Sequence, residues 1–282
     1  MTSTEETSLK LTAITVREGI LTSIHAAKAG HPGGSLSAAD LFTYLYFQEM
    51  NIDPANPHWE NRDRFVLSKG HTTPGLYAAL AHRGFFLTED LLTLRQIGSH
   101  LQGHPNMNLT PGVDMSTGSL GQGLSVAAGM AKGAKFLNKP IRVYSLLGDG
   151  ELAEGQIWEA TMFASHYQLD NLCIIVDLNG LQIDGRTCDV MNSEPVDEKF
   201  AAFGCHVVQI DGHNFQDMEQ AFAHFHANQG TGKPTVILMK TTKGKGVSFM
   251  EDQASWHGKA PNDTEYAQGM AELAAARAAL EV

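Results

Sequence analysis

A strand–helix–strand unit with polar residues after both strands, residues 141–179, limits most strongly what this chain can fold into. Residues 141–147 and 171–178 are apolar and rich in β-branched side chains, as is typical of buried parallel strands. Between them, residues 152–168 have the apolar spacing of a helix. Asp149 and Asn179 directly follow the two strands, and ligands bind at the carboxyl ends of strands in open parallel sheets. The unit therefore predicts a ligand site at one edge of a parallel sheet.

The residues at these two strand ends suit Mg²⁺ and a diphosphate. Gly148 and Gly150 allow a sharp turn and close approach of a ligand to the backbone. We expect the helix that follows them to direct free N–H groups and its positive dipole end at an anion. Asp149, Asn179 and the backbone carbonyl of Leu181 offer three oxygens to Mg²⁺, which commonly takes further ligands from phosphate and water. Gly-Asp-Gly and Asn-Gly also occur in ordinary turns, so the unit alone leaves a purely structural role open.

Strands and helices alternate along the rest of the chain. A second helix is predicted to open at Ser37, with Asp40 three residues later in a capping-box-like arrangement. This alternation predicts an α/β fold, a doubly wound parallel sheet with right-handed crossovers and helices on both faces. The expected strands are 64–68, 141–147, 171–178, 204–211 and 234–241, and the expected helices include 7–29, 74–82, 152–168, 214–228, 263–280 and one that ends near 137.

Charge and cysteine content exclude several classes of function. The formal net charge of −11 argues against nucleic-acid and anionic-membrane partners, because the chain offers no basic surface for either. The three cysteines lack paired spacing, and Cys173 in a predicted strand is expected to be buried; with no signal-type segment, this predicts a cytoplasmic protein without disulfides. Three lysines after the last predicted strand, Lys240, Lys243 and Lys245, are expected to be solvated, while their position leaves a phosphate role open.

Four histidines lie in loops next to Gly, Pro or Trp. A single histidine at a helix end is more often a cap than a catalytic group. Four of them in one chain, together with the pair Asp149 and Asn179, favour a functional site over separate turns. The four are His31, His71, His104 and His257.

Six ordered motifs, taken together, resemble those of transketolase, specifically its amino-terminal, thiamine-diphosphate-binding domain. They extend over nearly the whole chain, at 29–34, 67–71, 103–105, 117–123, 148–155 and 256–258. The family transfers a two-carbon ketol unit from a ketose phosphate to an aldose phosphate. The resemblance implies one diphosphate-binding domain, residues 1–282, with the pyrimidine-binding and C-terminal domains of a full-length enzyme absent from this chain.

The resemblance also implies roles by position, with thiamine diphosphate and Mg²⁺ as cofactors. Asp149, Asn179 and the Leu181 carbonyl match the Mg²⁺ ligands, and Asn179 also counts among the cofactor contacts. The diphosphate contacts are matched by His71, Gly150 and His257, and the residues around the two cofactor rings by Gly118, Ser119, Leu120 and Ile183. The groups that bind sugar hydroxyls and move protons are matched by His31, His104 and His257, and the acids near a dimer axis by Glu154 and Glu159.

The sequence departs from the family pattern in places. Ser119 stands where many full-length members have Pro, and the stretch 186–198 is shorter than in the long form. The glutamate that protonates the aminopyrimidine and the arginines that grip the sugar phosphate belong to the part that this chain lacks. We therefore expect the partner to be a separate C-terminal transketolase subunit, with an α₂β₂ assembly and sugar-phosphate substrates.

Two alternatives remain beside a split transketolase. The alpha subunit of a 2-oxo-acid dehydrogenase or decarboxylase would share the Gly-Asp-Gly and Asn unit, but would not need the four histidines that suit a polyhydroxylated sugar. A non-catalytic cofactor-binding scaffold would be free to lose Asp149, Asn179 or Glu154, and all three are present.

Overall fold

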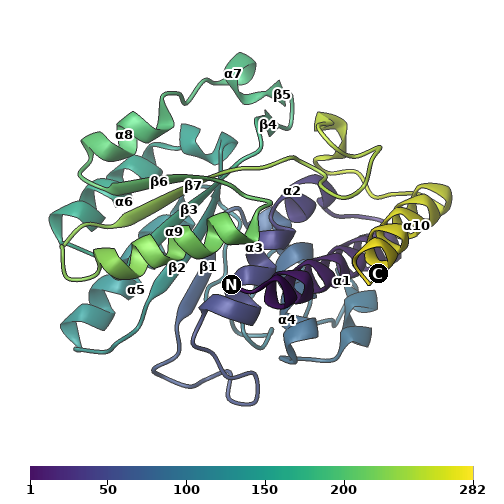
Figure 1. Ribbon diagram of the computed structural model, residues 1–282, viewed down its shortest axis with the longest axis horizontal. Helices are drawn as coiled ribbons and strands as arrows, with labels where there is room; N and C mark the ends of the chain where they lie inside the picture. Colours follow the sequence, from purple (N-terminus) through teal and green to yellow (C-terminus); the bar gives the residue numbers. More distant parts are fainter. Residues whose placement is uncertain (282) are drawn as a thin grey trace.

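A five-stranded sheet, parallel throughout, forms the centre of the computed structural model, which describes residues 1–281 (Figure 1). The strand order is β1-β2-β3-β7-β6. The predicted α/β class with a parallel sheet is confirmed. The strands are β1 (Arg64–Leu67), β2 (Val143–Gly148), β3 (Leu172–Leu178), β6 (His206–Asp211) and β7 (Thr235–Lys240).

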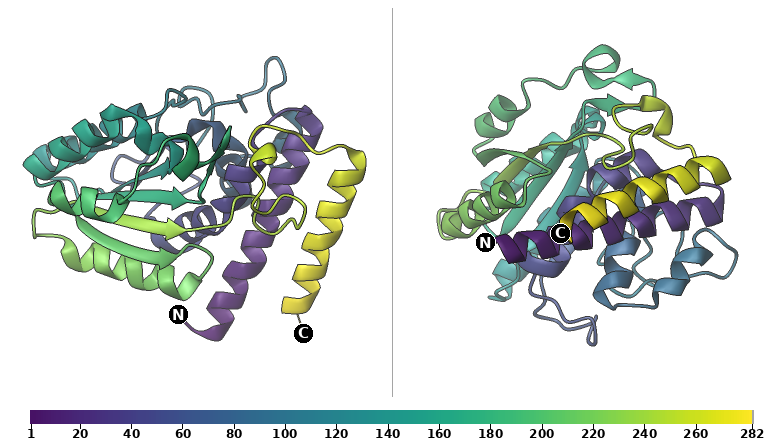
Figure 2. Two further views of the ribbon diagram at one scale, coloured as in Figure 1. Left: turned by 90° about the horizontal axis from the view of Figure 1, so that it is seen from above. Right: turned by 45° about the vertical axis from the view of Figure 1, so that its right-hand side comes forward.

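Helices cover both faces of this sheet, as predicted (Figures 1 and 2). Ile175 of β3 packs into the hydrophobic core on one face, and its neighbours Ile174 and Val176 pack into the core on the other. The strand is therefore buried on both sides, which explains its continuous apolar sequence. The first core is covered by α1 (Ser3–Ala27), α3 (Ala39–Tyr44), α4 (Thr73–Arg83) and α9 (Phe215–Asn228), with α10 (Asp263–Leu280) beside α1; the second is covered by α5 (Gln122–Phe136), α6 (Gly155–His166) and α8 (Val196–Ala202).

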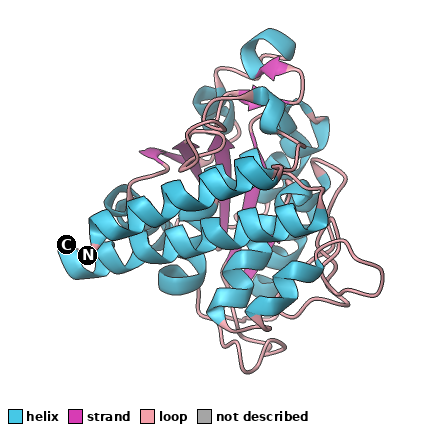
Figure 3. Ribbon diagram, turned by 90° about the vertical axis from the view of Figure 1, so that its right-hand side faces the viewer, coloured by secondary structure: helices cyan, strands magenta, loops and turns pink. Residues whose placement is uncertain are grey.

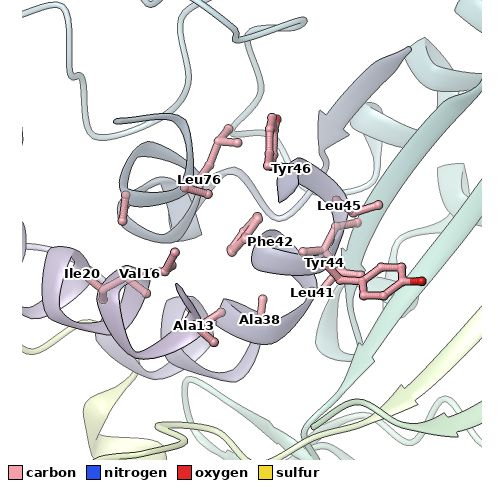
Figure 4. Packing of buried hydrophobic residues seen from close by; sticks show 14 of the residues in the cluster. Ala13, Val16, Ile20, Ala38, Leu41, Phe42, Tyr44, Leu45, Tyr46 and Leu76 are labelled. Carbon is pink, nitrogen blue, oxygen red and sulfur yellow. The ribbon is translucent and has the colours of Figure 1, made fainter. Parts of the chain in front are cut away.

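Phe42 lies in the middle of the first core. Figure 4 shows it between Val16 of α1 and Leu76 of α4. A Cβ atom on Gly75 would collide with the Phe42 ring, so this glycine allows α4 to pack closely against α3. This packing fixes the chain on either side of the loop that carries His31.

The predicted helix from Ser37 is wrong in its start and its cap. The chain instead forms α2 (Pro32–Ser37), breaks at Ala38 and continues as α3. The Ser37 hydroxyl donates to Asp177 at 2.6 Å, and Asp40 pairs with Arg17 at 2.6 Å. Both side chains have tertiary partners, so neither is available for a capping box.

The α-helix expected directly after the glycines also starts later. A 3₁₀ turn, η4 (Gly150–Ala153), comes first, and α6 begins only at Gly155. The Gly150 N–H donates to the Asp149 carboxylate at 2.8 Å, and the Gly148 N–H donates to Glu151 at 3.0 Å. The Gly150 N–H, at the start of the turn, is therefore already bonded to a carboxylate in this structure, and the α-helix begins later than expected.

A small hairpin, β4 (Leu181–Gln182) with β5 (Gly185–Arg186), follows β3 and was not expected. Figure 3 shows it with α7 (Thr187–Val190), apart from the main sheet. Within residues 1–281, none of the helices is long and apolar enough to cross a membrane. Cys173 is buried in β3, as predicted. Short helical turns complete the chain: η1 (Leu45–Glu49), η2 (Gly70–Thr72), η3 (Thr88–Thr93) and η5 (Ala254–Trp256).

Candidate active site

Four neighbouring strands deliver side chains to one cavity of about 250 Å³ at their carboxyl ends. In Figure 2 the strand arrows end on the side where α2 and the segment after β7 lie. Strand β1 leads to Lys69 and His71, β2 to Asp149 and β7 to Lys243. Strand β3 leads to the stretch 179–183, and other walls come from His31, Gly34, Gly118, Leu120 and His257.

The three predicted metal ligands lie together in this cavity. Gly148 of β2 is in register with Asp177 of β3, so Asp149 and Asn179 follow adjacent strand ends. The Asn179 side-chain amide donates to Asp177 at 3.0 Å, and its oxygen accepts the Leu181 N–H at 3.1 Å, an orientation assigned from the hydrogen-bond network. The three residues expected to bind the metal therefore line one cavity, and their role as metal ligands stays a prediction.

The electrostatics of Asp149 favour a bound cation. The carboxylate is 6% exposed, and burial, followed by the charge of Asp177, raises its pKa to about 6. The Lys243 charge acts in the opposite direction: it lowers the pKa of Asp149, and its ammonium donates to the Leu181 carbonyl, the third predicted ligand, at 3.2 Å. Among residues 1–281, no group of three His, Cys, Asp or Glu side chains is placed to hold a metal. A cation here would thus depend on one carboxylate, one amide, one carbonyl and a ligand's own oxygens.

A buried ion pair between Lys69 and Asp177 lies next to these ligands. The Lys69 ammonium lies 2.5 Å from Asp177 and donates to the Gly34 carbonyl at 3.0 Å. Burial alone would raise the pKa of Asp177, but the Lys69 charge and hydroxyl hydrogen bonds lower it overall. Asp177 also accepts from Asn179, so the pair fixes the orientation of a predicted metal ligand.

Three of the four predicted histidines meet at the cavity. The His31, His71 and His257 ring centroids are 5.1 to 5.5 Å apart. Burial, assisted by nearby positive charge, lowers the pKa of His31 to about 4, that of His71 to about 2 and that of His257 to about 3. All three rings are therefore neutral at pH 7. Within the described residues the buried Nδ1 of His31 has no hydrogen-bond partner, and Nδ1 of His257 accepts from Lys243 at 3.0 Å, which leaves its proton on Nε2.

His104 and Ser119 lie outside the cavity wall. His104 is exposed, and its ring is 3.1 Å from where a Cβ on Gly118 would stand. Ser119 is also exposed, two residues after Thr117, whose hydroxyl donates to the Leu67 carbonyl at 2.6 Å. His104 is thus at the entrance, where a substrate would pass, and the predicted roles of both residues stay predictions.

Glu154 and Glu159 are exposed on the outer surface. Glu154 packs against Gly121, and Glu159 lines a shallow groove between α5 and α6 with Phe163. Neither carboxylate reaches the cavity within this chain. Their predicted place near a dimer axis stays a prediction.

Sequence reasoning missed several residues of the cavity. Lys243 was expected to be solvated, but it is only 2% exposed, because Gly33 lies against its side chain. Lys69 stands inside a motif that was recognised for its histidine, and only the fold shows that its amine is buried. Gln182 lines the cavity, and within residues 1–281 its buried Nε2 has no hydrogen-bond partner. An isolated Gln gives no such signal in a sequence.

The family model of the transketolase thiamine diphosphate binding domain matches residues 9–279 of this chain. The chain belongs to the transketolase family. It is 45% identical over 271 residues to the 6-deoxy-6-sulfo-D-fructose transketolase subunit of Clostridium sp. MSTE9. The alignment covers 96% of this chain and 98% of that relative. It is 42% identical over 267 residues to an apulose-4-phosphate transketolase subunit of Phocaeicola vulgatus, covering 94% of each.

The solved transketolase of Campylobacter jejuni has the same fold. It superposes with a TM-score of 0.88 at 33% identity, covering 96% of this chain and 45% of the solved one. This transketolase-family chain thus spans under half of that solved transketolase, and nearly all of the two relatives that are named as subunits. These matches confirm the predicted family, the thiamine-diphosphate-binding fold and the assignment to an enzyme subunit of the transketolase type.

Proposed function

We propose that this chain is the diphosphate-binding subunit of a two-chain transketolase that uses Mg²⁺ and thiamine diphosphate. In the overall reaction the C2–C3 bond of a ketose breaks, and its two-carbon ketol unit joins the aldehyde carbon of an acceptor sugar. The observation that carries the proposal is the meeting of Asp149, Asn179 and Leu181 with three neutral histidines in one cavity.

The residues present fit the proposed cofactor. The buried Asp149 carboxylate, whose pKa is raised to about 6, gains from a cation, and Asn179 and the Leu181 carbonyl would complete the protein's share of Mg²⁺ ligands. Lys243 and the unpartnered amide of Gln182, among the described residues, offer donors for diphosphate oxygens. When bound, thiamine diphosphate supplies the electron sink that lets a carbon–carbon bond beside a carbonyl break and form.

The histidines would bind hydroxyl groups of the substrate and take part in proton transfer. The His257 Nε2–H can donate to a substrate hydroxyl, because its Nδ1 is held by Lys243. The buried Nδ1 of His31, with no partner within residues 1–281, can exchange a hydrogen bond with the same substrate. Both rings are uncharged at neutral pH and can therefore exchange hydrogen bonds with substrate hydroxyls at their ring nitrogens. A positioned proton-transfer group contributes about 10²–10⁴-fold when its pKa lies near the working pH, so a role in proton transfer would need the bound cofactor and substrate to raise these pKa values. His104 at the entrance would bind the far hydroxyls of the sugar.

A partner chain would complete the site. We propose that it supplies the pyrimidine-binding domain, that two copies of each chain assemble as α₂β₂, and that Glu154 and Glu159 lie near the contact between the two sites. Their exposure in this chain is consistent with such a contact. Ile183 and Leu120 are apolar and exposed at the edge of the cavity, where a second chain could cover them and close the cavity.

The choice of sugar is proposed to depend on the partner chain as well. The two relatives that are named as subunits are named for different sugars, one carrying a sulfo group and one a phosphate. We propose a ketose donor with an anionic end group that is recognised by the partner chain. The net charge of −11 argues against attraction of this anion by the general surface of the present chain.

The test mixes the purified chain with its co-purifying partner, Mg²⁺ and thiamine diphosphate. Transfer from xylulose 5-phosphate to ribose 5-phosphate is followed by mass spectrometry, with pyruvate as the competing donor. Transfer that needs both chains and both cofactors is the expected result. Full activity of the isolated chain would contradict the two-chain proposal, and pyruvate consumption without ketol transfer would favour a 2-oxo-acid enzyme.

A further inference from the structure

The segment that carries Lys243 is held from outside the cavity by three side chains, Arg17, Asp40 and His213. Arg17 of α1 forms two hydrogen bonds to Asp40 of α3, at 2.9 and 2.6 Å, and both residues are buried. His213 follows β6 and lies 2.7 Å from the same carboxylate through Nδ1. We call these three residues the brace.

The brace contacts the chain on both sides of Lys243. His213 Nε2 accepts the Thr242 N–H at 2.8 Å, and the Arg17 Nε–H donates to the Lys245 carbonyl at 3.0 Å. A backbone N–H can only donate, so Nε2 has no proton and the Nδ1 proton is donated to Asp40. One carboxylate therefore sets both the tautomer of His213 and the orientation of Arg17.

The backbone between these two anchors is closely confined. The Gly244 N–H donates to the Gly33 carbonyl at 2.9 Å, and Gly244 has φ of +79°, with the Met250 carbonyl where a Cβ would stand. A Cβ on Gly246 would lie 2.9 Å from the Arg17 side chain. The Lys243 side chain is thus attached to a backbone that has little conformational freedom, and its ammonium reaches the cavity at Leu181.

We infer that the brace positions Lys243 to bind the diphosphate. Strand β6 contributes no side chain to the cavity wall, but His213, which follows it, influences the site through this contact. The inference rests on the proposed function in assigning Lys243 to the diphosphate. It goes further in making His213 a positioning residue that acts only through the segment 242–245. Placing a long, flexible lysine side chain in advance lowers the entropic cost of binding.

The experiment compares two substitutions of His213. Gln can still present an oxygen to the Thr242 N–H, whereas Leu cannot. His224→Leu, at an exposed position on α9, is the matched control. Asp40 is left unchanged, because its loss would strand the buried Arg17 charge and endanger folding.

The first readout is amide hydrogen exchange of the peptide 241–246 in the full chain without cofactor. His213→Leu should speed exchange about tenfold, the ratio expected for one lost hydrogen bond, and His213→Gln should stay within about threefold of wild type. Unchanged exchange in His213→Leu would overturn the inference.

The second readout is the Kd of Mg²⁺–thiamine diphosphate by calorimetry, with the partner chain present. His213→Leu should raise this Kd about tenfold, and His213→Gln should largely restore it. In a Lys243→Met background, His213→Leu should add less than about twofold, because the two residues act in one chain of contacts. Independent, multiplying effects would overturn the inference and leave the proposed function standing. Failure of the wild-type complex to bind the cofactor would instead overturn the proposed function, and this inference with it.

Discussion

The Asp149 carboxylate accepts the backbone N–H of Gly180 at 2.6 Å and so ties the end of β2 to the end of β3. Gly180 stands between Asn179 and Leu181, the other two proposed metal ligands. The same carboxylate that would bind the cation thus also places the segment that supplies the remaining protein oxygens.

Asp149→Asn should weaken binding of Mg²⁺–thiamine diphosphate by more than about 100-fold. Loss of a residue that only hydrogen-bonds to a metal ligand costs about 10–100-fold in affinity, and Asp149 is proposed to bind the metal directly. The substitution removes the only negative charge among the three proposed ligands. Calorimetric titration at fixed Mg²⁺ measures the effect, with the exposed Asp53→Asn as control. Undiminished affinity in Asp149→Asn would mean that the metal site has been placed wrongly.

His104→Ala should leave cofactor affinity within about threefold of wild type and lower kcat/KM for the ketose donor by about 10²-fold. The reason is its position at the entrance, beside Gly118, rather than in the cavity wall. Steady-state kinetics of the two-chain complex, together with a cofactor titration, separate the two effects. A large loss of cofactor affinity with normal turnover at saturation would refute this assignment.

His71 should make the chain less stable in mild acid. Burial lowers its pKa in the folded state to about 2, against 6.5 for an ordinary histidine, so below pH 6.5 the unfolded chain takes up a proton that the folded chain does not. Stability is therefore intact above pH 6.5 and declines as pH falls toward the folded pKa. Between pH 7.5 and 5.5 this one group should cost about 1.4 kcal/mol of unfolding free energy.

Urea unfolding at the two pH values measures this cost. His71→Gln should lose about 1.4 kcal/mol less than wild type over the same interval, whereas the exposed His224→Gln should behave as wild type. An equal acid loss in wild type and His71→Gln would show that the buried ring does not drive it.

Two glycines of α5 should respond in opposite directions to alanine. A Cβ on Gly123 would lie 2.6 Å from the Ser68 Cα, a backbone atom, so Gly123→Ala should destabilise the chain by about 1–3 kcal/mol. Gly129 has open space at its Cβ position, and Gly129→Ala should stabilise the isolated chain by up to about 1 kcal/mol. Urea unfolding of both variants tests the pair, and destabilisation by Gly129→Ala would contradict the packing described for α5.

The sequence predicted the elements whose signals are local. The predicted bounds of 263–280 match α10, because Asn262 and Glu265 form a capping box at its start. The central strands were found because they are buried on both faces and therefore continuously apolar. Asp149 and Asn179 were brought together correctly, since carboxyl ends of adjacent parallel strands must meet.

The sequence failed where a distant partner decides the outcome. The Ser37 hydroxyl donates to Asp177, 140 residues away, rather than to a helix start. Lys243 is buried only because Gly33, from another segment, makes room for it. The hairpin β4–β5 has two residues in each strand, too few for any periodicity. These outcomes depend on the assembled tertiary structure, which local patterns do not encode.

Within residues 1–281 the strands β4 and β5 pair with each other and with no other strand, and Ile183 in the turn between them is 69% exposed at the mouth of the cavity. Substitutions there can reshape the wall that meets a substrate while the five central strands keep their register. The outward-facing turn can therefore tolerate changes in sequence that the interior strands cannot, whereas Leu181 and Gln182 beside it also line the cavity and are constrained by it.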